Sequence, residues 1–172
     1  RALVAEEGFF QLPLDAEQLT ANIRFFPMII PSFIIIMSAI FTAFHHLLAR
    51  VLLKYFGIQL ERLPKLREWQ FPRAFIYWYL LSLFLLLIGM MDEGGMLYPI
   101  VVNVQSVLEI IMYLQGLAVI AYFSHLKKKG FLLPAITIGL TILFPLFVML
   151  FVRILGILEL GFGLRARMRP SE

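Results

Sequence analysis

Glu109 is the residue of this 172-residue chain whose type and position are most suggestive of chemistry. It is the one charged residue in the 31-residue run 94–124, and it lies at the midpoint of that run. An ionised side chain at the centre of a membrane helix costs about 2.5 to 3.5 kcal/mol on insertion scales, so such an acid is a candidate functional residue. Side chains three or four positions away share its helix face, namely Gln105, Ser106, Met112 and Tyr113.

Two interpretations of Glu109 follow from this pattern. In the first, Glu109, Gln105, Ser106 and Tyr113 form a ligand, cation or proton site inside a helix bundle. In the second, Glu109 is a protonated carboxyl that hydrogen-bonds a neighbouring helix, since burial disfavours the ionised form unless a cation or a base from another helix is present. Asn103 and Gln115 lie elsewhere on the same run and are interpreted as interhelical hydrogen-bonding groups.

Metal-site and enzyme patterns are absent from the sequence. His45 and His46 are adjacent, so on a helix they point about 100° apart, and no third ligand follows at metal spacing. The chain has no cysteine, which excludes disulfides, thiolate metal sites and thiol nucleophiles. No nucleotide-binding P-loop, HExxH or GxSxG pattern occurs. We therefore expect neither catalysis nor a bound cofactor or metal.

The composition requires a membrane around these residues. Apolar residues make up 61% of the chain and charged residues 15%, with a mean hydropathy of +0.89. A soluble domain is about 45 to 50% apolar and about 25% charged. The runs 25–44, 74–91, 94–124 and 130–152 hold 20, 18, 31 and 23 residues, and at about 1.5 Å per residue each approaches or exceeds the roughly 30 Å hydrocarbon layer. The sequence thus predicts an all-α polytopic transmembrane bundle of about four spans.

Three regions are predicted along the chain. Residues 1–24 form an N-terminal segment in which Asp15 could cap a short amphipathic helix at the interface. Residues 25–164 form the transmembrane domain, and residues 165–172 form a basic tail. Because the first residue is Arg1 and no cleavable signal pattern precedes the first apolar run, we interpret the chain as a processed or truncated piece.

Basic residues predict the orientation of the bundle. The sequence has 15 Lys and Arg against 11 Asp and Glu, an excess that an anionic inner leaflet explains without any nucleic acid. The link between the first two runs holds six bases and two acids, the third link holds three lysines at 127–129, and the second link holds Asp92 and Glu93 without a base. The positive-inside rule places the first and third links in the cytoplasm.

The C-terminal arginines do not fit four simple spans. With four crossings Arg165, Arg167 and Arg169 would lie outside, where bases are not favoured. Either the last segment does not cross fully, or the 34-residue stretch 131–164 breaks near Pro145 and turns back.

Two further sets of residues are candidates for contact with lipid or protein. In the first link, two prolines and several bases surround Trp69, which indicates contact with anionic lipid or docking on a partner through Lys65, Arg67, Trp69 and Arg73. On the first span, Ala39 and Ala43 form a small-xxx-small face that predicts close helix packing.

Four motifs together resemble a known family. The chain contains "FFPMIIPS", "LPKLREWQFPR", "YLQGLAVIAYFSHLKKKG" and "ILGILELGFGLRAR". This order resembles the C-terminal half of the YybS-like family of bacterial membrane proteins, whose members are longer and largely of unknown function. That family is similar in layout to the substrate-capture (S) components of energy-coupling-factor vitamin transporters. The resemblance implies binding of a small solute and docking on a partner transmembrane subunit.

We therefore expect a transporter-like, solute-binding protein of the plasma membrane. Its partners would be the lipid bilayer, an unidentified solute and either another membrane protein or a second copy of the chain. The alternative is a non-transporting scaffold that assembles with other membrane proteins. Replacement of Glu109 by Gln should matter for a transport site and be tolerated in a scaffold.

The orientation can be tested with single cysteines, because the chain has none of its own. We expect a cysteine in place of Asp92 to react with an impermeant thiol reagent in intact cells, and cysteines in place of Lys65 or Lys128 to stay unlabelled until the membrane is opened. Labelling at position 65 but not at 92 would reverse the predicted topology.

Overall fold

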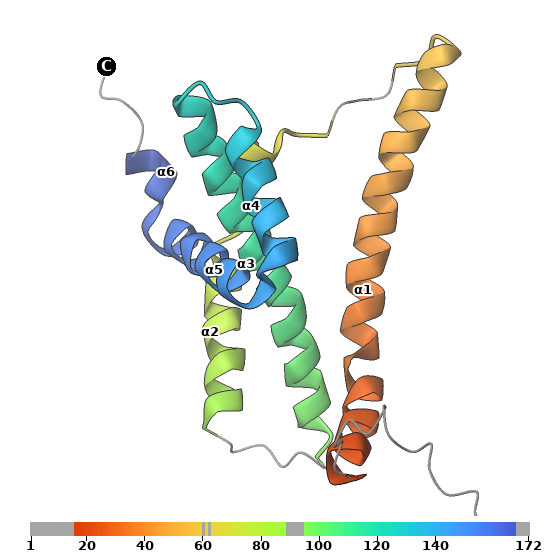
Figure 1. Ribbon diagram of the computed structural model, residues 1–172, viewed down its shortest axis with the longest axis vertical. Coiled ribbons are helices and arrows are strands. Elements are labelled where there is room, and N and C mark those ends of the chain that lie inside the picture. The colour runs from red at the N-terminus through yellow and green to blue at the C-terminus, as the bar shows by residue number, and fades with distance from the viewer. Residues whose placement is uncertain (1–15, 60, 62, 89–94, 168–172) are drawn as a thin grey trace, which may run out of the picture.

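A computed structural model describes residues 16–59, 61, 63–88 and 95–167, with side chains from residue 26 onward. Within these ranges the chain is helical and contains no strand, which confirms the all-α class. Figure 1 shows the helix α3 (Leu97–Leu126) in contact with the other elements around it. The elements are α1 (Ala16–Tyr55), the 3-10 helix η1 (Leu66–Glu68), α2 (Ala74–Leu87), α3 (Leu97–Leu126), α4 (Leu132–Leu143), α5 (Pro145–Phe162) and α6 (Leu164–Arg167).

Three of these helices are long and apolar enough to cross a membrane: Phe26–Tyr55 of α1, and α3 and α5 over their full lengths. The helices α2 and α4 are apolar but hold only 14 and 12 residues. Large apolar side chains lie exposed along α1, α2, α4 and α5, as expected for surfaces that face lipid. The chain is thus a multi-pass membrane helix bundle.

The run 130–152, which is long enough to span, is divided between two helices. Phe144 leaves the helical region with φ −132° and ψ 65°, and Pro145 begins α5 because proline has no amide hydrogen with which to continue α4. In Figure 1, α4 descends along part of α3, and α5 then leads the chain back toward the end at which α3 finishes. Of the two alternatives that the C-terminal arginines leave open, the structure shows the break near Pro145 with a reversal of direction.

At the other end of the chain, no break marks the predicted boundary between residues 1–24 and the first span. From Ala16 the helix α1 continues through Pro27 and Pro31 to Tyr55. Residues 1–15, with the predicted cap Asp15, lie outside the described residues.

Asn103 of α3 holds α1 against the bundle at these prolines. Its Oδ1 accepts a hydrogen bond from the backbone N of Ser32 at 2.7 Å, and its Nδ2 donates to the carbonyl oxygen of Met28 at 2.5 Å. In a regular helix these two backbone groups are bonded to each other. The side-chain amide of Asn103 supplies a partner to each of them, in the turn where Pro31 removes a backbone donor. The interhelical role predicted for Asn103 is confirmed. Towards its C-terminal end α1 leans away from the other helices (Figure 1).

The helices α3 and α5 pack closely against each other at two glycines. A Cβ atom on Gly116 would fall on the carbonyl oxygen of Val152, and one on Gly156 would fall on that of Met112. Beside this crossing lies a core of Tyr79, Leu108, Met112 and Leu160. Small residues permit such close approach of helices in membranes, where lipid removes the hydrophobic driving force between them.

Gly156→Ala should therefore destabilise the protein, because the backbone of α3 leaves no space for a methyl group. We expect a loss of about 1 to 3 kcal/mol, typical of overpacking, in the free energy of unfolding measured by denaturant titration in detergent micelles. A Cβ on Gly139 of α4 would have no neighbouring atom within 4 Å, so Gly139→Ala is the matched control and should be neutral or slightly stabilising. Equal stability of the two variants would contradict the close crossing.

Candidate functional site

Glu109 forms an ion pair with Arg153, a residue that sequence analysis did not single out. Nη1 of Arg153 on α5 lies 2.7 Å from Oε1 of Glu109 on α3. The arginine side chain is 18% exposed and the carboxylate 35%. Arg153 is thus a base from another helix that lies directly against this acid. The pair can form because the break at Pro145 sends α5 back across α3.

The residues predicted to accompany Glu109 make contacts of their own. Oε1 of Gln105 accepts from the hydroxyl of Ser82 on α2, and the hydroxyl of Tyr113 donates to Oγ1 of Thr141 on α4 at 2.9 Å. The hydroxyl of Ser106 donates to a carbonyl one turn earlier in α3. These three side chains therefore bond to α2, to α4 and to α3 itself. Their predicted role in ligand binding stays a prediction.

Gln115 ties the first link to α3. Its side chain is fully buried, and its Oε1 accepts a hydrogen bond from the backbone N of Phe71 at 3.1 Å. Gln115 lies 11 residues before the end of α3, or about 16 Å along the helix. The link therefore lies beside the interior of α3 at this point and not at its C-terminal end. Gln115 thus joins α3 to another segment, as predicted, but its partner is the link and not another helix.

The four link residues predicted to contact lipid or a partner have mixed surroundings. Lys65 and Arg73 are exposed, whereas Arg67 and Trp69 are partly buried. Nε1 of Trp69 donates to the carbonyl oxygen of Pro64 at 3.0 Å, which closes the link around η1. Nε of Arg67 lies 3.5 Å from Oε1 of Glu68. Part of the link thus packs inside the protein, and contact of the exposed bases with lipid stays a prediction.

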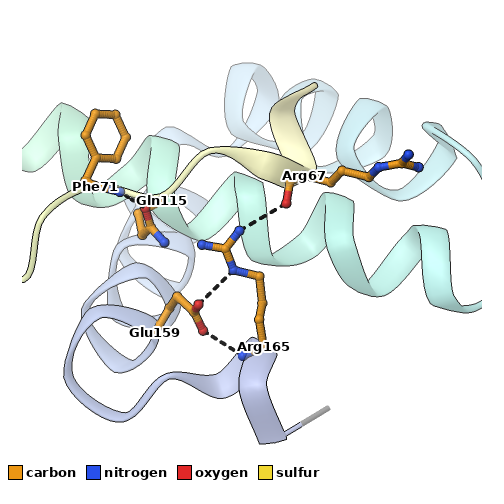
Figure 2. Close-up of polar contacts among 5 residues, drawn as sticks. All are labelled: Arg67, Phe71, Gln115, Glu159 and Arg165. Carbon is orange, nitrogen blue, oxygen red and sulfur yellow. Dashed lines mark hydrogen bonds and ion pairs between the residues drawn. The ribbon is translucent and has the colours of Figure 1, made fainter. Parts of the chain in front are cut away.

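A second ion pair, Glu159 with Arg165, anchors the C-terminal turn to this link (Figure 2). Oε1 of Glu159 accepts from Nε of Arg165 at 2.7 Å, and Oε2 accepts from the backbone N of the same residue at 2.9 Å. The arginine also donates through Nη1 to the carbonyl oxygen of Arg67 at 3.0 Å. The side chains of Glu159 and Arg165 are only 3% and 11% exposed. The start of the basic tail consequently lies at the same end of the bundle as the basic first link.

Gly163 makes this second pair possible. It adopts φ +63° and ψ +53°, a left-handed conformation that ends α5 and turns the chain into α6. The turn returns Arg165 to Glu159 six residues earlier. The sequence does carry a signal for this arrangement, since an acid near a helix end followed by glycine and arginine is a capped terminus with a charge partner, but sequence analysis did not use it.

A pocket of about 420 Å³ opens at this end of the bundle. Its lining comes from the first link, the C-terminal part of α3 and the turn between α5 and α6. Polar and charged side chains dominate the lining, which consists of Arg67, Glu68, Gln70, Arg73, Tyr122, His125, Glu159, Gly163, Arg165 and Ala166.

The remaining predicted residues lie apart from both ion pairs. Ala39 and Ala43 are exposed on α1, so this small-residue face does not pack against the described part of the chain, and its role in helix packing stays a prediction. Nδ1 of His45 bonds to the carbonyl oxygen of Phe41 in its own helix. No group of three potential metal ligands occurs among the residues described.

Comparison with known proteins agrees with this membrane bundle. Residues 5–160 match the family described as "Predicted membrane protein (DUF2232)". The chain belongs to the DUF2232 family. It is 31% identical over 159 residues to "Uncharacterized protein YybS" of Bacillus subtilis (strain 168), an alignment that covers 92% of this chain and 50% of that protein. The resemblance to YybS-like proteins is therefore confirmed, and the chain spans about half the length of this DUF2232 relative. No solved structure matches this chain.

Because the Glu159–Arg165 pair is buried, we expect a large coupling energy between the two residues in the stability of this DUF2232 chain. Glu159→Gln keeps the shape of the side chain but leaves a buried arginine uncompensated, which costs about 3 to 5 kcal/mol. The double variant Glu159→Gln/Arg165→Gln should lose less than the sum of the two single variants, as measured by unfolding in micelles.

Glu68→Gln is the control for this cycle. Glu68 also pairs with an arginine, but its side chain is 51% exposed, so we expect a change below about 1 kcal/mol. Additive effects of the two single substitutions would show that Glu159 and Arg165 do not interact in the folded protein.

Proposed function

We propose that this chain is part of a transporter-like protein of the bacterial plasma membrane that binds a small solute in its helix bundle and docks on a membrane partner. The observation that carries the proposal is the broken segment α4–α5, which places Arg153 against Glu109 between two helices. Discontinuous helices that bring charges to the interior of a bundle are a recurrent device of secondary transporters. No catalytic role is part of the proposal.

The exposure of the pair favours binding over a purely structural role. About a third of the Glu109 side chain is accessible, and its second carboxylate oxygen makes no hydrogen bond to the described residues. Nε of Arg153 is buried and lacks an acceptor in the same part of the chain. A solute with a carboxylate can compete for Arg153, and one with a cationic group can compete for Glu109. We therefore propose a small charged solute.

Docking is proposed on the exposed face of α1. Ala39 and Ala43 lie on this face, in the half of α1 that leans away from the bundle, and small residues allow another helix to approach. The docked helix belongs either to another membrane protein or to a second copy of the chain.

The competing candidate is a non-transporting scaffold. Several polar side chains in the bundle join helices to one another, as in the contacts of Gln105 with Ser82 and of Tyr113 with Thr141. If Glu109 and Arg153 do only the same, the pair serves assembly rather than solute binding.

Exchange of the charges of Glu109 and Arg153 distinguishes solute binding from a scaffold role. Glu109→Gln should lower the free energy of unfolding by about 1 to 3 kcal/mol because Arg153 loses its partner, and Glu109→Arg/Arg153→Glu should restore most of the loss. For a solute site, the exchanged protein regains stability but no longer retains the small molecule that copurifies with the full-length wild type, as detected by mass spectrometry.

The control for this experiment is Thr42→Val, which removes a hydroxyl that donates to the carbonyl oxygen of Ser38 within α1. It should leave both stability and the copurified molecule unchanged. An exchanged protein that keeps its bound molecules, or a wild type that copurifies with membrane proteins alone, would favour the scaffold.

A further inference from the structure

The 420 Å³ pocket at the basic end of the bundle is separate from the Glu109–Arg153 pair and has no role in the function proposed above. Three arginines contribute to its lining, from the first link and from α6, and His125 contributes from the last turn of α3. Two acids, Glu68 and Glu159, belong to the same lining.

Both acids are already neutralised by arginines of the pocket. Glu159 uses both of its oxygens on Arg165, and Glu68 lies 3.5 Å from Nε of Arg67. Arg73 forms no ion pair or side-chain hydrogen bond within the described ranges, and it is exposed at the start of α2. The uncompensated charge of the lining is therefore positive.

Arg165, which lines the pocket, and Gln115, which lies outside the lining, each carry a buried hydrogen-bond donor without an acceptor in the described part of the chain. The two donors are Nη2 of Arg165 and Nε2 of Gln115. The backbone N of Phe71 donates to Oε1 of Gln115, so the side-chain oxygen faces Phe71. The side-chain nitrogen Nε2 therefore points away from Phe71 and has no acceptor among the described residues. Figure 2 shows Nη2 of Arg165 on the side of the guanidinium that faces Gln115. Buried donors without acceptors are costly, and charged ones more so.

We propose that this pocket binds a phosphate group, carried either by a soluble compound or by a phospholipid headgroup. Arginines that approach from separate chain segments can donate to several oxygens of one tetrahedral anion. Arg73, the arginine of the lining without an ion pair in the described part of the chain, binds the phosphate at the mouth of the pocket, and Arg165 gains an oxygen acceptor for Nη2 through a small shift of its side chain. The pocket volume leaves room for the group that carries the phosphate.

The test uses full-length protein purified in a non-ionic detergent, with its melting temperature measured in sodium phosphate and in sodium chloride of equal ionic strength. A second arm adds phosphatidylglycerol or diacylglycerol, which lacks the phosphate, and counts bound lipids by native mass spectrometry. We expect phosphate, phosphatidylglycerol or both to stabilise the wild type beyond the matched reference.

Two variants assign the effect to this pocket. Gln115→Glu keeps the acceptor for the backbone N of Phe71 and supplies Arg165 with an internal carboxylate oxygen, so stabilisation by the probe should disappear. Arg73→Gln removes an exposed charge at the mouth of the pocket. It should lower the affinity for the probe about tenfold, the ratio expected for one lost charge-assisted hydrogen bond. Lys54→Gln, an exposed charge in the last turn of α1 outside the pocket, should leave the affinity unchanged.

Each outcome decides the proposal. Stabilisation by inorganic phosphate alone identifies a soluble ligand, and stabilisation by phosphatidylglycerol alone identifies a headgroup. If neither probe stabilises the wild type, the pocket holds only water and the proposal is wrong. It is equally wrong if Gln115→Glu and Arg73→Gln respond to the probe as the wild type does.

Discussion

The contact of α3 with α5 at Gly116 and Gly156 determines where the charged residues of this protein lie. The two backbones meet so closely that neither glycine can carry a side chain, and this fixes the position of α5 along α3. Arg153 and Glu159 stand three residues on either side of Gly156. The same contact therefore directs Arg153 towards Glu109 and holds Glu159 beside the first link, where Arg165 joins it. A shift of α5 by one turn would separate Arg153 from Glu109 and Arg165 from the carbonyl oxygen of Arg67.

Much of the fold follows from local properties of the chain that sequence alone displays. Apolar runs and charge counts are sufficient to predict a helical membrane protein, because the bilayer permits few other structures. The effect of Pro145 is also local, since a residue without an amide hydrogen cannot extend the helical bonding of α4, although α1 does continue through Pro27 and Pro31. Asn103 and Gln115 can be interpreted correctly because a buried amide in an apolar helix needs a partner on another segment.

The partners of the charged residues could not be predicted in the same way. Helical periodicity identifies neighbours on one helix, so it groups Gln105, Ser106 and Tyr113 with Glu109. The actual partner, Arg153, is 44 positions away and reaches Glu109 only because α5 turns back and crosses α3 at a particular register. The Glu159–Arg165 pair depends on the left-handed turn at Gly163, so six residues of sequence separation correspond to direct contact.

The two ion pairs differ in a way that bears on their roles. Glu159 is almost fully buried, and each of its oxygens accepts a hydrogen bond from Arg165, so exchange of a partner would leave a buried charge uncompensated. Glu109 is partly exposed and makes a single ion pair with the described residues, so water or a solute can replace Arg153 at a smaller cost. The first arrangement suits a fixed support for the C-terminal turn and the pocket beside it. The second suits a site whose contacts change when something binds, and both arrangements require the same break at Pro145 and the same glycine crossing.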